Sequence, residues 1–150
     1  MVEMLVAVGI IALLAAVFVL NAQGARSRAW EALAANHGGA VAQAVQSYLG
    51  VYVTETPSSL MERLSSRLPA ADWTGAPAAA RVGSQGGDRS CTGSYSLPDP
   101  SGATTRFSWP AAPSNVGCVL GLRTQGGLIR LQAITWVRGS SRWYVDGQAQ

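Results

Sequence analysis

The chain has 150 residues and a formal net charge of +3, and all 11 of its basic residues are arginine. That length gives room for one domain with a single hydrophobic core, and the mild positive charge falls short of the dense basic stripe of a dedicated nucleic-acid binder. Because the sequence contains no lysine, it excludes mechanisms that need a P-loop lysine, a Schiff-base lysine or a lysine general base.

The first expected element is an apolar helix. Residues 4–20 carry no charged or polar side chain, and as a helix these 17 residues would reach roughly 25 Å, just short of the roughly 30 Å hydrocarbon core of a bilayer. Glu3 precedes the run and Arg26 and Arg28 follow it, so the positive-inside rule would place the bulk of the chain in the cytoplasm. A secretory signal peptide cleaved near residues 22–24 is the other common interpretation, but it requires a basic residue before the run. Both difficulties disappear if a short basic leader precedes Met1.

The helical pattern continues beyond the apolar run, but it becomes one-sided. Over residues 25–53 the apolar side chains recur at helical spacing and define one broad stripe, while Arg28, Gln43 and Gln46 point away from it. One long helix is therefore expected to run into a soluble domain, with bending or melting between Asn21 and Gly24, where the sequence is weakest for a helix. The members of the stripe are Trp30, Leu33, Ala34, His37, Val41, Ala44, Val45, Tyr48 and Tyr52.

A short helix and a long loop are expected next. Residues 54–57 end the first helix, and Ser59 with Glu62 forms a candidate capping box for a second helix that Pro69 stops. Residues 70–90 are rich in Ala, Gly, Pro and Ser, with Trp73 as their one large apolar anchor, which predicts a surface loop. The apolar side of the short helix comprises Leu60, Met61, Leu64 and Leu68.

The remainder of the chain predicts an antiparallel sheet and hence an α+β fold. Short connections between the expected strands favour antiparallel neighbours. In the longest strand one face, which we expect to pack on the amphipathic part of the first helix, comprises Ile129, Leu131, Ala133, Thr135 and Val137. The expected strands are residues 93–97, 104–109, 118–124, 128–137 and 142–145.

Cys91 and Cys118 are the only cysteines. In an exported domain they would form one disulfide, and closing that loop would stabilise the fold by roughly 3 to 4 kcal/mol in the chain-entropy model. In a domain that stays in the cytoplasm, two buried thiols are expected instead.

Few other residues indicate a chemical site. His37, the only histidine, lies on the apolar stripe, which favours a buried, hydrogen-bonded core residue over a catalytic one. Without a second histidine or an acidic pair at ligand spacing, the sequence predicts neither a zinc site nor a catalytic triad. Residues 83–87 resemble a phosphate-binding loop but lack its Gly-Lys-Ser/Thr ending, and Asp146 alone is weak evidence for calcium. We therefore expect no enzyme activity, no cofactor and no metal.

Arginines and tryptophans lie close together in the strand region. Basic side chains interleaved with aromatic ones suit single-stranded nucleic acid, but ordinary solvated strand faces give the same pattern. DNA is therefore a weaker candidate partner. The candidate contacts are Arg106, Arg123, Arg130, Arg138 and Arg142, which lie on or beside strands with Trp109, Trp136 and Trp143.

The amino-terminal stretch MVEMLVAVGIIALLAA, followed by an amphipathic helix, a loop and a sheet, resembles the type IV pilin family and its pseudopilin relatives. In that family a basic leader ending in Gly is followed by Phe-Thr, two apolar residues and Glu. Glu3 takes the place of that glutamate, so the mature chain is expected to begin two residues before Met1. The resemblance implies a pilin fold, in which a hydrophobic helix half protrudes and an amphipathic half packs on a four- to five-stranded antiparallel sheet. The implied parts are a membrane and filament-core helix, 1–24, and a head domain, 25–150, made of the helix 25–53, the loop 54–92 and the sheet 93–150.

The resemblance also implies a function. A major or minor pilin would wait in the inner membrane as a single-pass protein with its head outside the cytoplasm, and would then polymerise into an extracellular pilus for motility, adhesion or DNA uptake. Its partners would be copies of itself, other pilins, the pilus assembly machinery, prepilin peptidase and the inner membrane. The side chains expected in the membrane and the filament core are Met4, Leu5, Val6, Val8, Ile10, Ile11, Leu13, Leu14, Val17, Phe18 and Leu20.

Glu3 has the most specific role in this interpretation. A carboxylate in an apolar setting costs on the order of 2.5 to 3.5 kcal/mol or more unless it is paired. The resemblance implies pairing with the free amino terminus of the adjacent subunit, which would fix the axial register; alternatively, Glu3 lies at the headgroup level of the membrane. A pseudopilin of a type II secretion or competence system is the close alternative function, and a membrane-tethered enzyme or binding domain is the alternative from another class.

Overall fold

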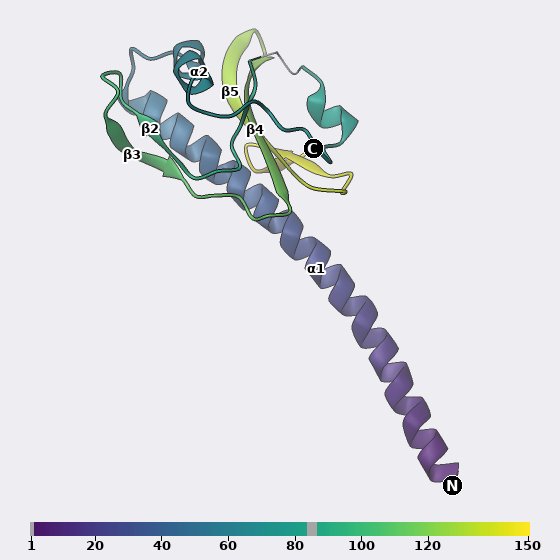
Figure 1. The fold of residues 1–150 in the computed structure, drawn as a ribbon. Helices are drawn as coiled ribbons and strands as arrows, with labels where there is room; N and C mark the ends of the chain where they lie inside the picture. Colours follow the sequence, from purple (N-terminus) through teal and green to yellow (C-terminus); the bar gives the residue numbers. More distant parts are fainter. Residues whose placement is uncertain (1, 84–86) are drawn as a thin grey trace. The chain divides into compact units, whose positions relative to one another are not determined.

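The computed structural model describes residues 2–83 and 87–150 and has the α+β fold that the sequence predicts (Figure 1). Two compact units make up the chain, the first ending at Trp30 and the second covering Glu31–Gln150. The elements are α1 (Val2–Val51), α2 (Pro57–Ser65), the 3-10 helix η1 (Ala78–Arg81), β1 (Arg89–Ser90), β2 (Tyr95–Pro98), β3 (Thr104–Trp109), β4 (Val116–Gln125), β5 (Leu128–Val137), β6 (Trp143–Val145) and β7 (Gln148–Ala149).

The first unit consists of the apolar part of α1. Helical backbone continues through Asn21 and Gly24, so the expected melting at these residues is not observed. A single glycine costs a helix only about 1 kcal/mol relative to alanine, and the alanine- and leucine-rich sequence around it favours the helix strongly enough to offset that cost.

In the second unit, α1 packs one side against the sheets. Leu33, a predicted member of the stripe, is 41% exposed because it lies at the stripe's edge. Tyr48 and Tyr52 pack with their ring centroids 4.6 Å apart, and both contact Phe107 edge-on. The rest of the stripe is largely confirmed, since its buried members are Ala34, His37, Val41, Ala44, Val45 and Tyr48.

The N-cap of α2 is Thr56. Thr56 Oγ1 accepts the backbone N–H of Ser59 at 3.1 Å, and Ser59 Oγ accepts the backbone N–H of Thr56 at 3.0 Å. The capping box expected from Ser59 and Glu62 is therefore wrong: Pro57 occupies the first helical position, where its missing N–H costs no hydrogen bond, and Thr56 precedes it. The buried side chains of α2 are, as predicted, Leu60, Met61 and Leu64.

Two antiparallel sheets form where the sequence predicted one. The larger has the order β1-β4-β5-β6-β7. The smaller pairs β2 with β3, which Figure 1 shows beside each other. Strands β3 and β5 have the predicted bounds, and β2, β4 and β6 lie close to theirs. The sequence missed β1 and β7 because a two-residue strand shows no alternation of polar and apolar side chains. As a result, β1 lies inside the segment that was expected to be loop.

Strand β5 is covered on both faces over its second half. On one face Ala133 belongs to the main core, and Thr135 Oγ1 donates a hydrogen bond to the carbonyl oxygen of Ala34 at 2.8 Å, which confirms that this face packs on α1. On the other face, Trp136 stacks on Trp73 with ring centroids 5.5 Å apart. Residues 70–83, expected to be surface loop, therefore cover the second face of the sheet. The main core comprises Val41, Ala44, Val45, Tyr48, Leu60, Met61, Leu64, Cys91, Leu97, Trp109, Cys118, Leu120, Leu131 and Ala133.

Gly38 allows the close contact between α1 and the larger sheet. A Cβ atom on Gly38 would lie 2.8 Å from Thr135 Oγ1 and 3.2 Å from the backbone nitrogen of Gly147. Gly147 has a φ of +83°, and a Cβ there would lie 2.8 Å from the carbonyl oxygen of Ala35. Gly38 is thus the residue of α1 against which the turn between β6 and β7 lies.

Candidate functional site

The most extensive apolar surface lies on the first unit. Each described large apolar side chain from Val2 to Val19 exposes between 52% and 75% of its area. Leu5 and Leu20 belong to the predicted set, but their side chains lie outside the described residues. The exposed side chains are Val2, Met4, Val6, Val8, Ile10, Ile11, Leu13, Leu14, Val17, Phe18 and Val19.

The chain itself does not shield this apolar surface from water, so lipid or another protein must do so. Apolar side chains surround the helix axis, which is the pattern of a helix buried in protein or lipid. The apolar stretch of α1 is not buried by the rest of the chain, and α1 is long and apolar enough to cross a membrane. At about 25 cal/mol per Å² of apolar area, exposing this surface to water would cost many kcal/mol.

Glu3 lies in the first turn of α1 and is exposed. It is the only charged residue before Arg26. Its pairing with another subunit stays a prediction.

Cys91 and Cys118 form the predicted disulfide, with Cα atoms 5.0 Å apart. The backbone N–H of Cys91 also donates to the carbonyl oxygen of Cys118 at 3.1 Å. His37 is 5% exposed, and its Nε2 donates to the carbonyl oxygen of Cys91 at 3.0 Å. Burial lowers the pKa of His37 despite this hydrogen bond, so the ring is neutral at neutral pH. The prediction of a hydrogen-bonded core histidine is confirmed.

The five arginines of the candidate nucleic-acid surface are distributed over both sheets and do not form one site. Arg123 is only 8% exposed, and its two Nη atoms bind the carboxylate of Asp88 at 3.0 and 2.9 Å. The structure therefore removes Arg123 from the candidate contacts, because a buried guanidinium held by a carboxylate cannot reach a phosphate. The exposed members are Arg106, Arg130, Arg138 and Arg142.

Three of the exposed arginines have local partners as well. Arg138 lies 3.6 Å from Asp72, Arg142 lies 2.7 Å from Glu31, and Arg106 lies over the ring of Phe107. Trp109 and Trp136 are buried and donate their indole N–H groups to the backbone, so neither can stack on a base. Nucleic-acid contact by the exposed arginines stays a prediction, and of the three tryptophans that suggested it Trp143 alone is half-buried rather than buried.

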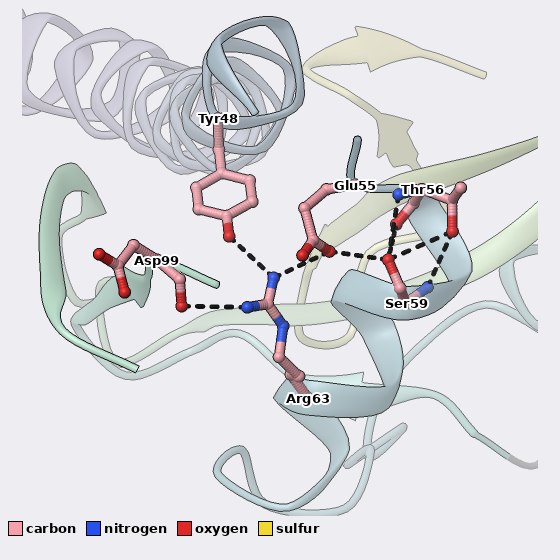
Figure 2. Close-up of polar contacts among 6 residues, drawn as sticks. All are labelled: Tyr48, Glu55, Thr56, Ser59, Arg63 and Asp99. Atoms are coloured by element: carbon pink, nitrogen blue, oxygen red, sulfur yellow. Dashed lines mark hydrogen bonds and ion pairs between the residues drawn. The ribbon is translucent and has the colours of Figure 1, made fainter. Parts of the chain in front are cut away.

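Figure 2 shows a polar cluster around Arg63 that the sequence did not reveal. Arg63 Nη2 donates to the hydroxyl of Tyr48 at 2.8 Å and lies 2.9 Å from the carboxylate of Glu55, and Nη1 donates to the carbonyl oxygen of Asp99 at 3.0 Å. Burial raises the pKa of Tyr48, so its hydroxyl stays protonated. The cluster joins the end of α1, α2 and the turn between β2 and β3, which is a structural role.

Asp146 forms the turn between β6 and β7 together with Gly147. Their φ angles of +51° and +83° are those of a two-residue hairpin turn that favours Asp-Gly and Asn-Gly. Asp146 Oδ1 accepts the backbone N–H of Ala133 at 2.8 Å. Burial raises the pKa of Asp146 above its ordinary value of 3.8, since Ala133 and the charge of Arg130 offset only part of the effect. Among the described residues no group of three His, Cys, Asp or Glu side chains could hold a metal ion.

Asp146→Asn is expected to stabilise the fold slightly at neutral pH. A raised folded-state pKa means that the folded chain binds the proton of Asp146 more tightly than the unfolded chain does. The free energy of unfolding therefore falls as the pH rises from about the ordinary pKa of an aspartate through the raised pKa of the folded state. Asparagine keeps the acceptor and the turn preference without titrating. Thermal unfolding followed from pH 3 to 7 should show a flatter profile for the variant. Asp99→Asn is the control of opposite sign, because the Ser101 hydroxyl lowers the pKa of Asp99, and equal profiles for all three chains would contradict the assignment.

Comparison of the chain with protein-family models, curated proteins and solved structures finds no match. The functional interpretation therefore depends on the features of the chain itself, namely the exposed apolar part of α1 and the second unit, in which the rest of α1 packs on antiparallel sheets.

Proposed function

We propose that this chain is a pilin, a structural subunit of a type IV pilus that polymerises through α1. The observation that carries the proposal is the apolar surface of the first unit, which is exposed on all sides in a helix whose later part belongs to an α+β head. A membrane anchor alone would explain the apolar segment. The order of apolar helix, amphipathic helix and antiparallel sheet, with Glu3 at the start, is what favours a filament subunit.

Assembly follows from the two environments available to the helix. Before assembly, the apolar side chains lie in the inner membrane with the head outside the cytoplasm. In the filament, the same side chains pack against the corresponding helices of neighbouring copies, so that little of this area meets water during the transfer. The chain thus acts without catalysis, and its partners are other copies, other pilins and the machinery that extracts them from the membrane.

Glu3 sets the register between neighbouring copies in this proposal. In the apolar interior of a filament, an unpaired carboxylate is unfavourable by on the order of 2.5 to 3.5 kcal/mol or more, whereas a subunit placed so that its amino group meets Glu3 removes most of that penalty. A single axial position then has the lowest free energy, and the filament grows with a constant rise.

Glu3→Ala and Glu3→Gln test this role. Each variant is expected to lower the amount of filament recovered by shearing at least tenfold, because the amino group of the neighbouring subunit loses its counter-charge. The measurement is an immunoblot of the sheared and membrane fractions from the native host. Glu62→Gln is the matched control, since Glu62 is an exposed glutamate on α2, far along the chain from the apolar helix.

Two results would contradict parts of the proposal. Normal filaments from Glu3→Ala would exclude the register mechanism. Retention of the unmodified chain in the cell envelope, with none in shed filaments, would exclude a pilus subunit and favour a pseudopilin of a secretion or competence system.

A further inference from the structure

The second face of the larger sheet carries a hollow beside the stacked tryptophans. Its volume is about 420 Å³, within the range of small-molecule pockets in proteins. Cross-strand register places Ile134 opposite Val145 and Trp136 opposite Trp143, so Ile134, Val145 and Trp143 line this face together. Ala80 of η1 lines the hollow from the segment that covers the sheet.

Two glycines of β4 determine what fills the neighbouring parts of this face. The ring of Trp136 occupies the space that a side chain on Gly117 would take, and the ion pair of Asp88 and Arg123 occupies the space above Gly121. Gln132 lies opposite Gly121 on β5 and lines the hollow. The hollow therefore begins where these bulky groups end.

The side-chain charges of the hollow are balanced. Among the described lining residues Arg123 is the only one with a charged side chain, and both Nη atoms of that guanidinium bind the carboxylate of Asp88. Neither an anion nor a cation finds an uncompensated charged side chain among them. The remaining polar lining consists of the neutral side chains of Thr124, Gln125, Gln132 and Gln150.

These neutral groups offer both donors and acceptors around an apolar floor. Gln132 Nε2 and Gln125 Oε1 are 3.4 Å apart, so their contact leaves the carbonyl oxygen of Gln132 and the amide nitrogen of Gln125 for a ligand. Trp143 is half-buried and presents part of its indole to the hollow. A ligand that matches this lining has no charge, several hydroxyl groups and an apolar C–H face that can pack on an aromatic ring.

We propose that this hollow binds a neutral saccharide of about one or two sugar rings. Trp143 packs against the C–H face of a ring, the glutamine amides and Thr124 bind its hydroxyl groups, and Ile134 and Val145 form the floor. The inference goes beyond the filament function, because every lining residue belongs to the head and none belongs to the apolar helix.

The test uses the full chain, labelled with ¹⁵N, in a detergent with a phosphocholine headgroup, because a maltoside headgroup would compete. The five tryptophans give separate indole N–H signals, and Trp143→Phe assigns the relevant one. Titration with cellobiose, lactose and N,N′-diacetylchitobiose is expected to shift the Trp143 signal saturably for at least one sugar and to leave the signal of Trp109 in the main core unchanged.

Variants of the lining separate specific binding from weak general contact. Gln132→Ala is expected to weaken binding about tenfold, the usual effect of one lost hydrogen bond. Gln150→Ala is expected to act in the same direction, and because Gln150 is exposed and lies outside the strands, this substitution leaves the fold intact. Gln46→Ala, an exposed glutamine on α1, is the matched control and should bind like the parent chain. Absence of a saturable shift with all three sugars, an equal shift with glucuronic acid, or unchanged binding by both lining variants would overturn the proposal.

Discussion

Replacing both cysteines with serine is expected to lower the free energy of unfolding by about 3 to 4 kcal/mol. The disulfide joins residues with a sequence separation of 27, and a loop of that length loses roughly this much conformational free energy in the unfolded state when it is closed. The pair of Cys91 and Cys118 is fully buried in the main core, so the variant also leaves two hydroxyl groups there. Urea unfolding of the detergent-solubilised chain, followed by tryptophan fluorescence, measures the difference.

Unfolding in the presence of dithiothreitol is the control for the cysteine variant. The reductant should remove most of the difference in the free energy of unfolding between the parent chain and the variant. The free energy of unfolding of the Cys91→Ser/Cys118→Ser chain should not change. If the oxidised parent and the variant unfold at the same urea concentration, the bridge does not constrain the unfolded chain and the predicted contribution is wrong.

Arg123→Met is expected to destabilise the head by about 3 to 5 kcal/mol. Asp88 is 5% exposed, and removal of the guanidinium leaves a buried carboxylate without that compensating charge, which is among the most costly single changes in a protein interior. The same urea titration measures the effect, which should depend little on salt because the pair is shielded from solvent.

Arg138→Met provides the matched comparison. Its ion pair with Asp72 is 3.6 Å long, and both side chains are about half exposed, so this substitution should change the free energy of unfolding by no more than about 1 kcal/mol. If the two methionine variants lost the same free energy of unfolding, the burial of Arg123 would not be what determines its contribution to stability.

The sequence predicted the elements that have a regular apolar period. The stripe on α1 and strands β3 and β5 follow from spacing, because the residues that cover these elements lie at fixed intervals along them. The cysteine pair could likewise be predicted, since the chain offers only one pairing. The apolar helix could be predicted because a run of this length without a polar side chain is typical of helices that lie in lipid or between other helices.

Contacts between distant segments could not be predicted from the sequence in the same way. Asp88 and Arg123 are 35 residues apart, and no local pattern predicts that a loop carboxylate will lie over a glycine of β4. The cluster of Arg63 with Tyr48 and Asp99 depends on the packing of three elements. The N-cap of α2 was missed for a smaller reason, since Thr56 and Ser59 offer a reciprocal pair that competes with Ser59 and Glu62 at the same spacing.

The stack of Trp73 on Trp136 provides the head with a built-in optical signal. The two indole planes are 10° from parallel at a centroid distance of 5.5 Å, which is close enough for their electronic transitions to couple. Where the two transition dipoles are twisted relative to each other within their planes, exciton coupling gives a paired circular-dichroism band, and that band disappears when one ring moves away. Trp73 belongs to the covering segment and Trp136 to β5, so the band reports whether that segment lies on the sheet, and it does so in the unlabelled protein.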